Sequence, residues 1–304
     1  MNMNIISFLK RGVLLILLFF CIDLILSLIL LNGLNKFYGF NNNPAILING
    51  SSMSLAGFNR REIENKTGKN VIAYNQEGAS VEDRYVMIKQ IYSKYPESIE
   101  TVVYEINPRL LSGIRSAENV FIRFYPYMDD KSIRKYIKEQ ARPLEFYINY
   151  FIRVKRFESR LVRLIMLAHL GKNESFKTNV LDSTDFAQST DGKTKIKIEE
   201  SKINVFEDTM EIIRLNNSKV ILVMMPMYIQ KFNTFEKESY IGFCRYFQDF
   251  CAEHKNTLFL DLNQDSLIYN PSFFSDQLHF NVYGQKEITN IIITQLMHNG
   301  SGYN

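Results

Sequence analysis

Five short runs of consecutive apolar residues, separated by stretches with helical spacing, constrain the fold of this 304-residue chain most strongly. The runs occupy residues 45–49, 70–74, 101–106, 219–225 and 257–261. Continuous rather than alternating apolar residues are typical of strands that are buried on both faces. Helical spacing of apolar residues is found at 81–95, 203–215, 235–253 and 283–297. This alternation predicts an α/β fold, a flavodoxin-like three-layer sandwich with a central parallel sheet of about five strands.

The functional site of such a sheet forms beyond the carboxyl ends of its strands. Ser52 follows the first run within the sequence NGSSM, where Gly50 allows the chain to turn tightly. A serine held at the tip of a buried strand is a candidate nucleophile. The alternative is an ordinary loop, because Gly-Ser-Ser is common there.

Asp276 and His279 lie three residues apart just before the last helical stretch. In a turn, the carboxylate can accept a hydrogen bond from one ring nitrogen. The other nitrogen is then free to act as a base toward a serine hydroxyl. The alternative is a helix start at which Asp276 is the cap and His279 is exposed.

Two further residues are candidate donors to an oxyanion. Asn107 ends the third run, and its amide is a possible donor; the alternative is an Asn-Pro turn. Gly78 follows the second run and offers an unobstructed backbone N–H; the alternative is an ordinary loop glycine.

A region at about 112–202 interrupts the alternation, and we interpret it as a helical insertion beside the site. Residues 143–170 predict one long helix, because apolar residues recur there at a spacing of three or four. The apolar positions are Phe151, Val154, Phe157, Leu161, Leu164 and Ala168. Four arginines between 153 and 163 make this helix basic. They either face anionic lipid headgroups or an anionic polymer, or form the solvated face of an amphipathic helix.

The composition fits a folded protein and argues against some classes of function. Hydrophobic residues make up 46% of the chain and charged residues 22%, with a formal net charge of +4. A nucleic-acid-binding protein usually carries a dense basic stripe, so no nucleic-acid partner is expected. The three cysteines and four histidines show no metal-ligand spacing, so no metal or other cofactor is expected.

Residues 12–32 predict a transmembrane anchor. The chain is almost wholly apolar from Gly12 to Leu31, and a helix of about 20 such residues crosses the hydrocarbon core of a bilayer. A cleaved signal peptide is the alternative, but it would have a shorter apolar core and a small-residue cleavage site, and this run ends without one. We therefore expect an uncleaved anchor.

The charges that flank the anchor predict its orientation. Lys10 and Arg11 stand just before the apolar run, whereas only Lys36 follows it closely. The positive-inside rule then puts the N-terminus in the cytoplasm and the rest of the protein outside the cell membrane. The expected order is a cytoplasmic segment, a single-pass anchor, a linker and a globular domain, at residues 1–11, 12–32, 33–44 and 45–304.

Asp23 lies near the middle of the apolar run. A carboxylate at that depth costs about 2.5–3.5 kcal/mol on insertion scales, and such residues are often paired. Two interpretations stay open at this point. Either a partner helix pairs with Asp23, or the long apolar run tolerates the carboxylate without a partner.

In their order along the chain, the candidate residues resemble the sequence blocks of the SGNH (GDSL-type) hydrolase superfamily. The resemblance covers residues 45 to about 297, apart from the insertion. The matching positions are a Gly-Asp-Ser-like block, a glycine, an asparagine and an Asp-x-x-His pair, at residues 50–52, Gly78, Asn107, and Asp276 with His279. The chain departs from the pattern at Ser51, Glu105 and Pro108, which replace Asp, Gly and Asp.

The resemblance implies a catalytic triad of Ser52, His279 and Asp276, with Gly78 and Asn107 in the oxyanion hole. Together with the anchor, it is similar to a membrane-anchored branch that contains teichoic acid D-alanyl transfer proteins and polysaccharide O-acetyltransferase accessory proteins. This similarity implies an extracytoplasmic serine acyltransferase or carbohydrate esterase.

The same branch implies partners as well. The acceptor would be a cell-surface polysaccharide or a teichoic-acid-like polymer, and a multispanning membrane O-acyltransferase would be the protein partner. The alternative function is a non-catalytic SGNH-like binding or scaffold subunit of such a membrane system, which the altered third block favours.

Overall fold

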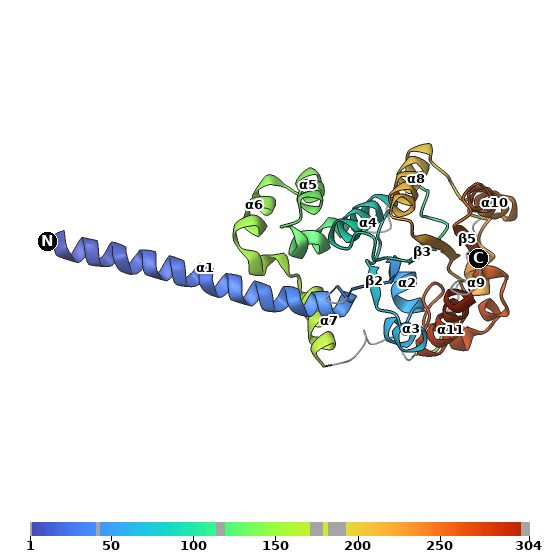
Figure 1. The fold of residues 1–304 in the computed structure, drawn as a ribbon, viewed down its shortest axis with the longest axis horizontal. Coiled ribbons are helices and arrows are strands. Elements are labelled where there is room, and N and C mark those ends of the chain that lie inside the picture. The colour runs from blue at the N-terminus through green and yellow to red at the C-terminus, as the bar shows by residue number, and fades with distance from the viewer. Residues whose placement is uncertain (1, 41–42, 114–118, 171–178, 182–192, 299–304) are drawn as a thin grey trace. The chain divides into compact units, whose positions relative to one another are not determined.

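The computed structural model describes residues 2–40, 43–113, 119–170, 179–181 and 193–298 (Figure 1). It divides into two compact units. The helical unit comprises Met1–Phe37 and Phe121–Glu174, and the sheet unit comprises Tyr38–Val120 and Ser175–Asn304. Of the predicted insertion at about 112–202, Phe121–Glu174 belongs to the same unit as the N-terminal helix.

The sheet unit contains a five-stranded sheet in which every pairing is parallel, in the order β2-β1-β3-β4-β5. The strands are β1 (Ile46–Gly50), β2 (Val71–Asn75), β3 (Thr101–Ile106), β4 (Lys219–Met224) and β5 (Thr257–Asp261). Each lies within one residue of a predicted run. The order is that of a flavodoxin-like fold, so the predicted α/β class is confirmed.

Helices cover both faces of this sheet (Figure 1). On one face, α11 (Val282–His298) packs on α2 (Ser52–Gly57) and α3 (Arg60–Thr67). On the other face, α4 (Val81–Lys94) packs on α8 (Glu200–Leu215), which in turn contacts α10 (Lys237–Glu253). Short elements complete the unit: α9 (Ile229–Phe232), η3 (Leu262–Gln264), η4 (Ser266–Tyr269) and η5 (Pro271–Phe273).

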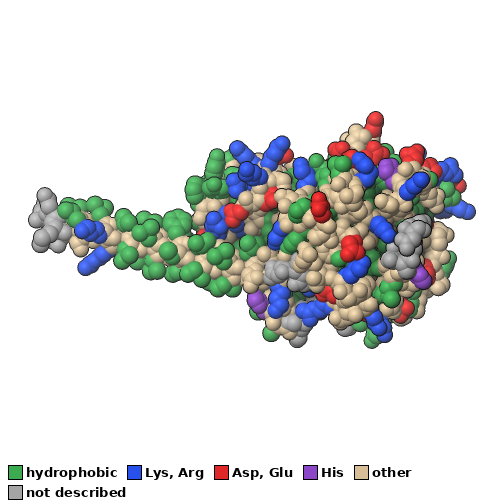
Figure 2. Space-filling model, viewed as in Figure 1, with side chains coloured by type: hydrophobic (Ala, Val, Ile, Leu, Met, Phe, Trp, Pro, Cys, Tyr) green, Lys and Arg blue, Asp and Glu red, His purple; other side chains and the backbone are tan. Residues whose placement is uncertain are grey.

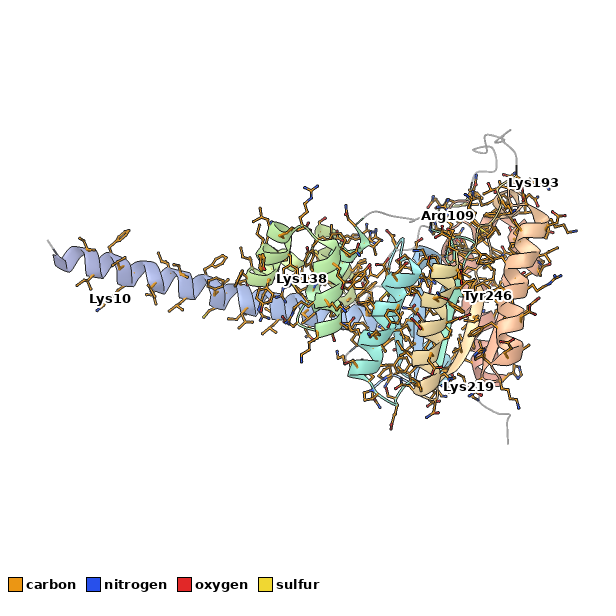
Figure 3. All side chains as sticks on the ribbon, turned by 90° about the horizontal axis from the view of Figure 1, so that it is seen from above. Lys10, Arg109, Lys138, Lys193, Lys219 and Tyr246 are labelled. Atoms are coloured by element: carbon orange, nitrogen blue, oxygen red, sulfur yellow. The ribbon has the colours of Figure 1, made fainter. Side chains whose placement is uncertain are left out.

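The strands alternate their side chains between two apolar layers, which explains their continuous apolar character. Ile48, Val103 and Ile221 belong to the buried cluster that also contains Ile288 and Ile292 of α11. The opposite layer includes Tyr104, whose ring meets Phe206 of α8 at 5.9 Å between centroids. Figure 3 shows the two ends of the sheet, with Lys219 where β4 begins and Arg109 just after β3.

The helical unit is built around α1 (Asn2–Tyr38). Apolar side chains cover most of this helix, with basic residues near its start (Figure 2). It is long and apolar enough to span a membrane. The helix begins before the predicted span of 12–32 and continues to Tyr38, so the first part of the predicted linker is helical instead.

The insertion adds η1 (Val120–Tyr127), α5 (Lys131–Gln140), α6 (Pro143–Phe151), η2 (Arg153–Arg156) and α7 (Ser159–His169). α7 runs close to α1 at Gly33, where a Cβ would lie 2.5 Å from the Ile165 side chain. The glycine therefore lets the two helices approach. Leu161, Leu164 and Ala168 of the predicted apolar stripe are buried as expected, but Phe151 is exposed.

The single long helix that the sequence predicts over residues 143–170 is wrong, because the chain breaks between α6 and α7. In a continuous helix, the N–H groups of Arg153 and Val154 would donate to the carbonyls of Asn149 and Tyr150. The carbonyls instead accept from Arg156, at 2.8 Å from Nε and 3.2 Å from Nη2. The side chain of Arg156 thus takes the place of the missing backbone donors.

The carboxylate of Asp23 accepts hydrogen bonds from the two backbone N–H groups that the break in the helix leaves without carbonyl partners. Its Oδ2 accepts from the Arg153 N–H at 2.8 Å, and its Oδ1 accepts from the Val154 N–H at 2.9 Å. Asp23 is buried. Its partner is therefore the backbone of its own chain, not a separate helix, and the cost of placing a carboxylate on an apolar helix is offset within the helical unit.

Candidate active site

Ser52 is the first residue of α2, two residues beyond the end of β1. Ser51 caps this short helix, because its Oγ accepts from the Met53 N–H at 3.3 Å. Gly50 precedes the cap, and a Cβ there would lie 2.5 Å from both the Glu105 carboxylate and the Ser54 side chain. Only glycine therefore allows the end of β1 to lie this close to the side chain of Glu105, which is part of the neighbouring strand β3.

Asp276 and His279 lie in the loop between η5 and α11. The carboxylate of Asp276 accepts from the backbone N–H groups of Leu278 and His279, each at 2.9 Å, which closes a tight turn. Asn281, not Asp276, caps α11, since its Oδ1 accepts from the N–H groups of Tyr283 and Gly284. The Asp276 carboxylate therefore both closes the turn and contacts the His279 ring.

Three side chains from distant parts of the sequence form one hydrogen-bonded chain. Nδ1 of His279 lies 2.9 Å from both carboxylate oxygens of Asp276. Nε2 of the same ring lies 2.9 Å from Oγ of Ser52. All three side chains are partly buried. This is the arrangement in which a carboxylate orients an imidazole and the imidazole can take a proton from a hydroxyl.

Burial raises the pKa of Asp276, but the hydrogen bonds from the His279 ring and the Leu278 N–H outweigh it and lower the pKa to about 2. The carboxylate therefore stays ionised at every pH at which the protein is expected to work. An ionised Asp276 favours the His279 tautomer with the proton on Nδ1, which leaves Nε2 free to face Ser52.

The lowered pKa of Asp276 predicts a pH-dependent share of the stability. A carboxyl whose pKa is lower in the folded state stabilises the protein above its unfolded pKa, and the contribution is lost as the pH falls toward the folded value. We expect wild type to melt above Asp276→Asn at neutral pH. The difference in melting temperature between the two proteins should begin to shrink below about pH 4. Thermal melts of both proteins across this range test it, and a gap that stays constant with pH would contradict it.

The two candidate oxyanion donors lie on the loops after β2 and β3, the strands that flank β1 in the sheet. Gly78 has a φ of +69°, a conformation that favours glycine. Its loop is tied to that of Ser52, because the Gln76 N–H donates to the Gly50 carbonyl at 3.1 Å. Asn107 follows β3 directly, and its Nδ2 donates to Oε1 of Glu105 at 2.7 Å. One N–H of that amide is therefore used to orient the side chain.

Glu105 is the most important residue near the site whose role the sequence did not predict. It is fully buried at the end of β3, and its carboxylate accepts from the Ser51 N–H, the Ser51 hydroxyl and the Asn107 amide. Arg84 of α4, also fully buried, pairs with it at 3.3 Å and donates to the Glu105 carbonyl. Burial raises the pKa of Glu105, but the Arg84 charge and these hydrogen bonds outweigh it and lower the pKa.

A signal for Glu105 was present in the sequence. A glutamate inside an otherwise apolar strand must be paired, because an isolated buried charge is too costly. Nothing in the sequence indicated that Arg84, on the helix after β2, would be its partner. The structure also ties Ser54 of α2 to the buried Asn75 at the end of β2, at 2.9 Å.

Among the residues that the structure describes, no group of three or more His, Cys, Asp or Glu side chains is arranged to hold a metal ion. The chemistry of this edge is that of a hydroxyl, an imidazole, a carboxylate and amide donors. Such a set is suited to nucleophilic acyl transfer.

No family model and no curated protein matches the sequence of this chain. Solved structures do resemble it. One is a proposed acylhydrolase from Bacteroides fragilis NCTC 9343, with 12% sequence identity and a TM-score of 0.43 over 84% of this chain and 86% of that one. Another is a GDSL-like lipase from Bacteroides thetaiotaomicron VPI-5482, with 10% identity and a TM-score of 0.43 over 85% and 89%. At these identities the likeness concerns the fold, and the activities in those names belong to those proteins.

Proposed function

We propose that this chain is a serine acyl-transfer enzyme of the SGNH type, with Ser52 as nucleophile, His279 as base and Asp276 as the residue that orients the imidazole. One observation carries the proposal. The His279 ring is 2.9 Å from Ser52 Oγ on one side and 2.9 Å from the Asp276 carboxylate on the other. These residues come from opposite ends of the sheet unit's sequence, and sequence order alone does not require them to meet.

The reaction begins when Nε2 of His279 takes the Ser52 proton and Oγ attacks the carbonyl carbon of an ester or thioester. The oxyanion receives hydrogen bonds from the N–H groups of Ser52 and Gly78 and from the Asn107 amide. The tetrahedral intermediate collapses, and the leaving group departs with the proton from His279 Nε2. An acyl group then remains bound to Ser52 Oγ.

The second half of the reaction repeats these steps with a new acceptor. His279 takes a proton from an acceptor hydroxyl or from water, and the acceptor oxygen attacks the acyl carbonyl. Ser52 Oγ leaves and recovers the proton. A hydroxyl acceptor gives transfer and water gives hydrolysis, so the two outcomes share these residues and differ in what the site admits.

The anchor supports a location and a substrate class for this reaction. Lys10 and Arg11 before the apolar run favour a cytoplasmic N-terminus, with the triad outside the cell membrane. There the enzyme would act on O-acyl groups of a cell-surface polysaccharide or teichoic-acid-like polymer. A multispanning membrane O-acyltransferase would supply the acyl group. Incubation with an acyl donor and a polysaccharide separates the outcomes, because transfer yields acylated polymer and hydrolysis yields free acid.

A fluorophosphonate probe tests the nucleophile directly. We expect the full-length protein to be labelled on the peptide that contains Ser52, because an oxygen activated by His279 attacks the probe and an ordinary hydroxyl does not. Ser52→Ala should lose the label. Ser98→Ala should keep it, since Ser98 lies before β3 at the other end of the sheet. Equal labelling of Ser52→Ala and wild type would show that the nucleophile is assigned wrongly.

A further inference from the structure

The outer face of α6 in the helical unit is covered by large apolar side chains that nothing within the described residues buries. Leu144 is 74% exposed and Phe151 is 60% exposed, and Tyr147, Ile148 and Tyr150 lie between them. Only Phe146 and Asn149 of this helix are buried. An apolar face of this density on one short helix is unusual for a surface in water. Such surfaces mark sites that contact a membrane or another protein.

Asp23 fixes the level of α6 along the membrane helix. Its carboxylate holds the N–H groups of Arg153 and Val154, which follow the end of α6 directly. Asp23 stands eight residues before Leu31, the last residue of the apolar run. At about 1.5 Å per residue, the end of α6 therefore lies roughly 12 Å inside the apolar part of α1.

The rest of α1 at this level is apolar and uncovered. Ile25 and Ile29 are exposed beside the buried Asp23 and Ser27. One side of α1 therefore packs on the insertion, and the other side presents the surface that a bilayer requires. Because the end of α6 lies at the level of these residues, a bilayer that covers Ile25 and Ile29 would also meet the exposed side chains at the end of α6.

The cations around α6 lie at its two ends. Arg142 precedes the helix and Lys155 follows it, and both line a pocket, whereas Arg153 pairs with Asp129 at 3.0 Å. Long basic side chains can reach the membrane surface while their stems stay at a greater depth.

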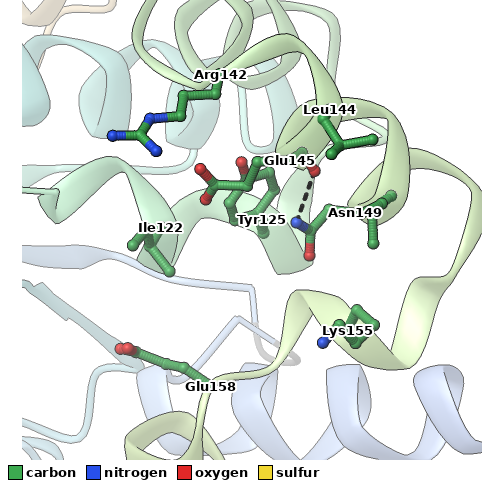
Figure 4. Close-up of a pocket in the computed structure, with 9 residues that line it drawn as sticks. Ile122, Tyr125, Arg142, Leu144, Glu145, Asn149, Lys155 and Glu158 are labelled. Atoms are coloured by element: carbon green, nitrogen blue, oxygen red, sulfur yellow. Dashed lines mark hydrogen bonds between the residues drawn. The ribbon is translucent and has the colours of Figure 1, made fainter.

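A pocket of about 470 Å³ flanks the same helix (Figure 4). Arg142, Glu145 and Lys155 are among its lining residues, and the Asn149 amide donates to the Glu145 carbonyl across one turn. Leu144 and Ile148 of α6 line the pocket as well, so the exposed aromatic side chains of α6 that lie outside it are Tyr147, Tyr150 and Phe151.

We propose that α6 lies among the acyl chains of the lipid leaflet at the C-terminal end of α1, with Tyr147 and Phe151 facing the lipid. The protein is then held by a spanning helix and by a second, membrane-embedded helix that Asp23 fastens to it. This proposal requires α1 to cross the membrane, but it does not depend on the enzymatic activity.

The absence of tryptophan from the chain makes a direct test possible. Single-tryptophan versions of the full-length protein, Phe151→Trp and Tyr147→Trp, are reconstituted in vesicles of phosphatidylcholine and phosphatidylglycerol with or without bromine on the acyl chains. Phe19→Trp on the exposed surface of α1 is the positive reference, and Tyr269→Trp on η4 is the water-exposed reference. We expect the bromine to remove most of the emission at positions 151, 147 and 19, and little at position 269.

Two results would overturn the proposal. If position 19 is quenched but positions 147 and 151 are not, the face of α6 meets water or protein, including a second copy of this chain. If none of the three is quenched, α1 is not in the bilayer and the premise fails. All four sites are exposed aromatic residues, so the replacements should leave the fold intact, and equal melting temperatures check this.

Discussion

Replacing Ser52 or His279 with alanine should lower kcat/KM for p-nitrophenyl acetate by at least about 10⁴-fold. Ser52→Ala removes the oxygen that forms the acyl-enzyme, and His279→Ala removes the base that lies 2.9 Å from it. The two residues act in one step, so the double variant should be about as slow as the slower single variant. Initial rates of the purified full-length protein, corrected for spontaneous hydrolysis of the ester, provide the measurement.

Matched replacements elsewhere in the sheet unit control for general damage. Ser98→Ala removes a hydroxyl that bonds the Tyr95 carbonyl, and His254→Ala removes a ring that stacks on Phe250. Neither residue contacts the triad, and both variants should turn over the ester at near the wild-type rate. The assignment of the triad fails if Ser52→Ala retains wild-type turnover, or if all of these variants lose activity equally.

Replacing Glu105 with glutamine should destabilise the sheet unit strongly. The change keeps the size of the side chain but leaves the fully buried Arg84 without its opposite charge. Breaking a buried pair in this way costs about 3–5 kcal/mol. For a unit of this size that corresponds to a fall in melting temperature of roughly 6–20 °C. A thermal melt of the full-length protein measures it, and a change of only a degree or two would contradict it.

A second substitution separates the structural role of Glu105 from its effect on the site. Adding Arg84→Met to Glu105→Gln removes both charges, and neutral pairs often restore the stability that a single replacement loses. The same carboxylate orients Ser51 and the Asn107 amide beside the nucleophile. We therefore expect the double variant to regain most of its melting temperature while kcat stays low. Recovery of both together would show that Glu105 acts only through stability.

The strands and most helices of the sheet unit could be predicted because they depend on local pattern. Continuous apolar runs mark strands that are buried on both faces, and each observed strand lies within one residue of such a run. The positions of Ser52, Asp276 and His279 at the carboxyl edge follow from the same pattern, since all carboxyl ends of parallel strands lie together. Their catalytic role stays a prediction that the kinetics above will test.

The helical insertion shows where local pattern is insufficient. Residues 143–170 have the spacing of one helix, yet two hydrogen bonds at its centre are replaced by contacts to Asp23 and Arg156. Asp23 lies 130 residues before Arg153 in the sequence. No window of neighbouring residues contains that information, and the contact gives Asp23 a partner that neither interpretation of the sequence included, the backbone of its own chain.

The sequence by itself determined the α/β class, the five strands, the apolar N-terminal helix and the residues at the edge of the sheet. These features depend on the periodicity of apolar side chains, which acts over a few neighbouring residues. Only the tertiary structure decided that Glu105 pairs with Arg84, that Asp23 breaks a helix far along the chain, and that His279 reaches Ser52. Each is a polar contact between distant segments. A buried polar group must find a partner, but the sequence does not say which segment will provide it.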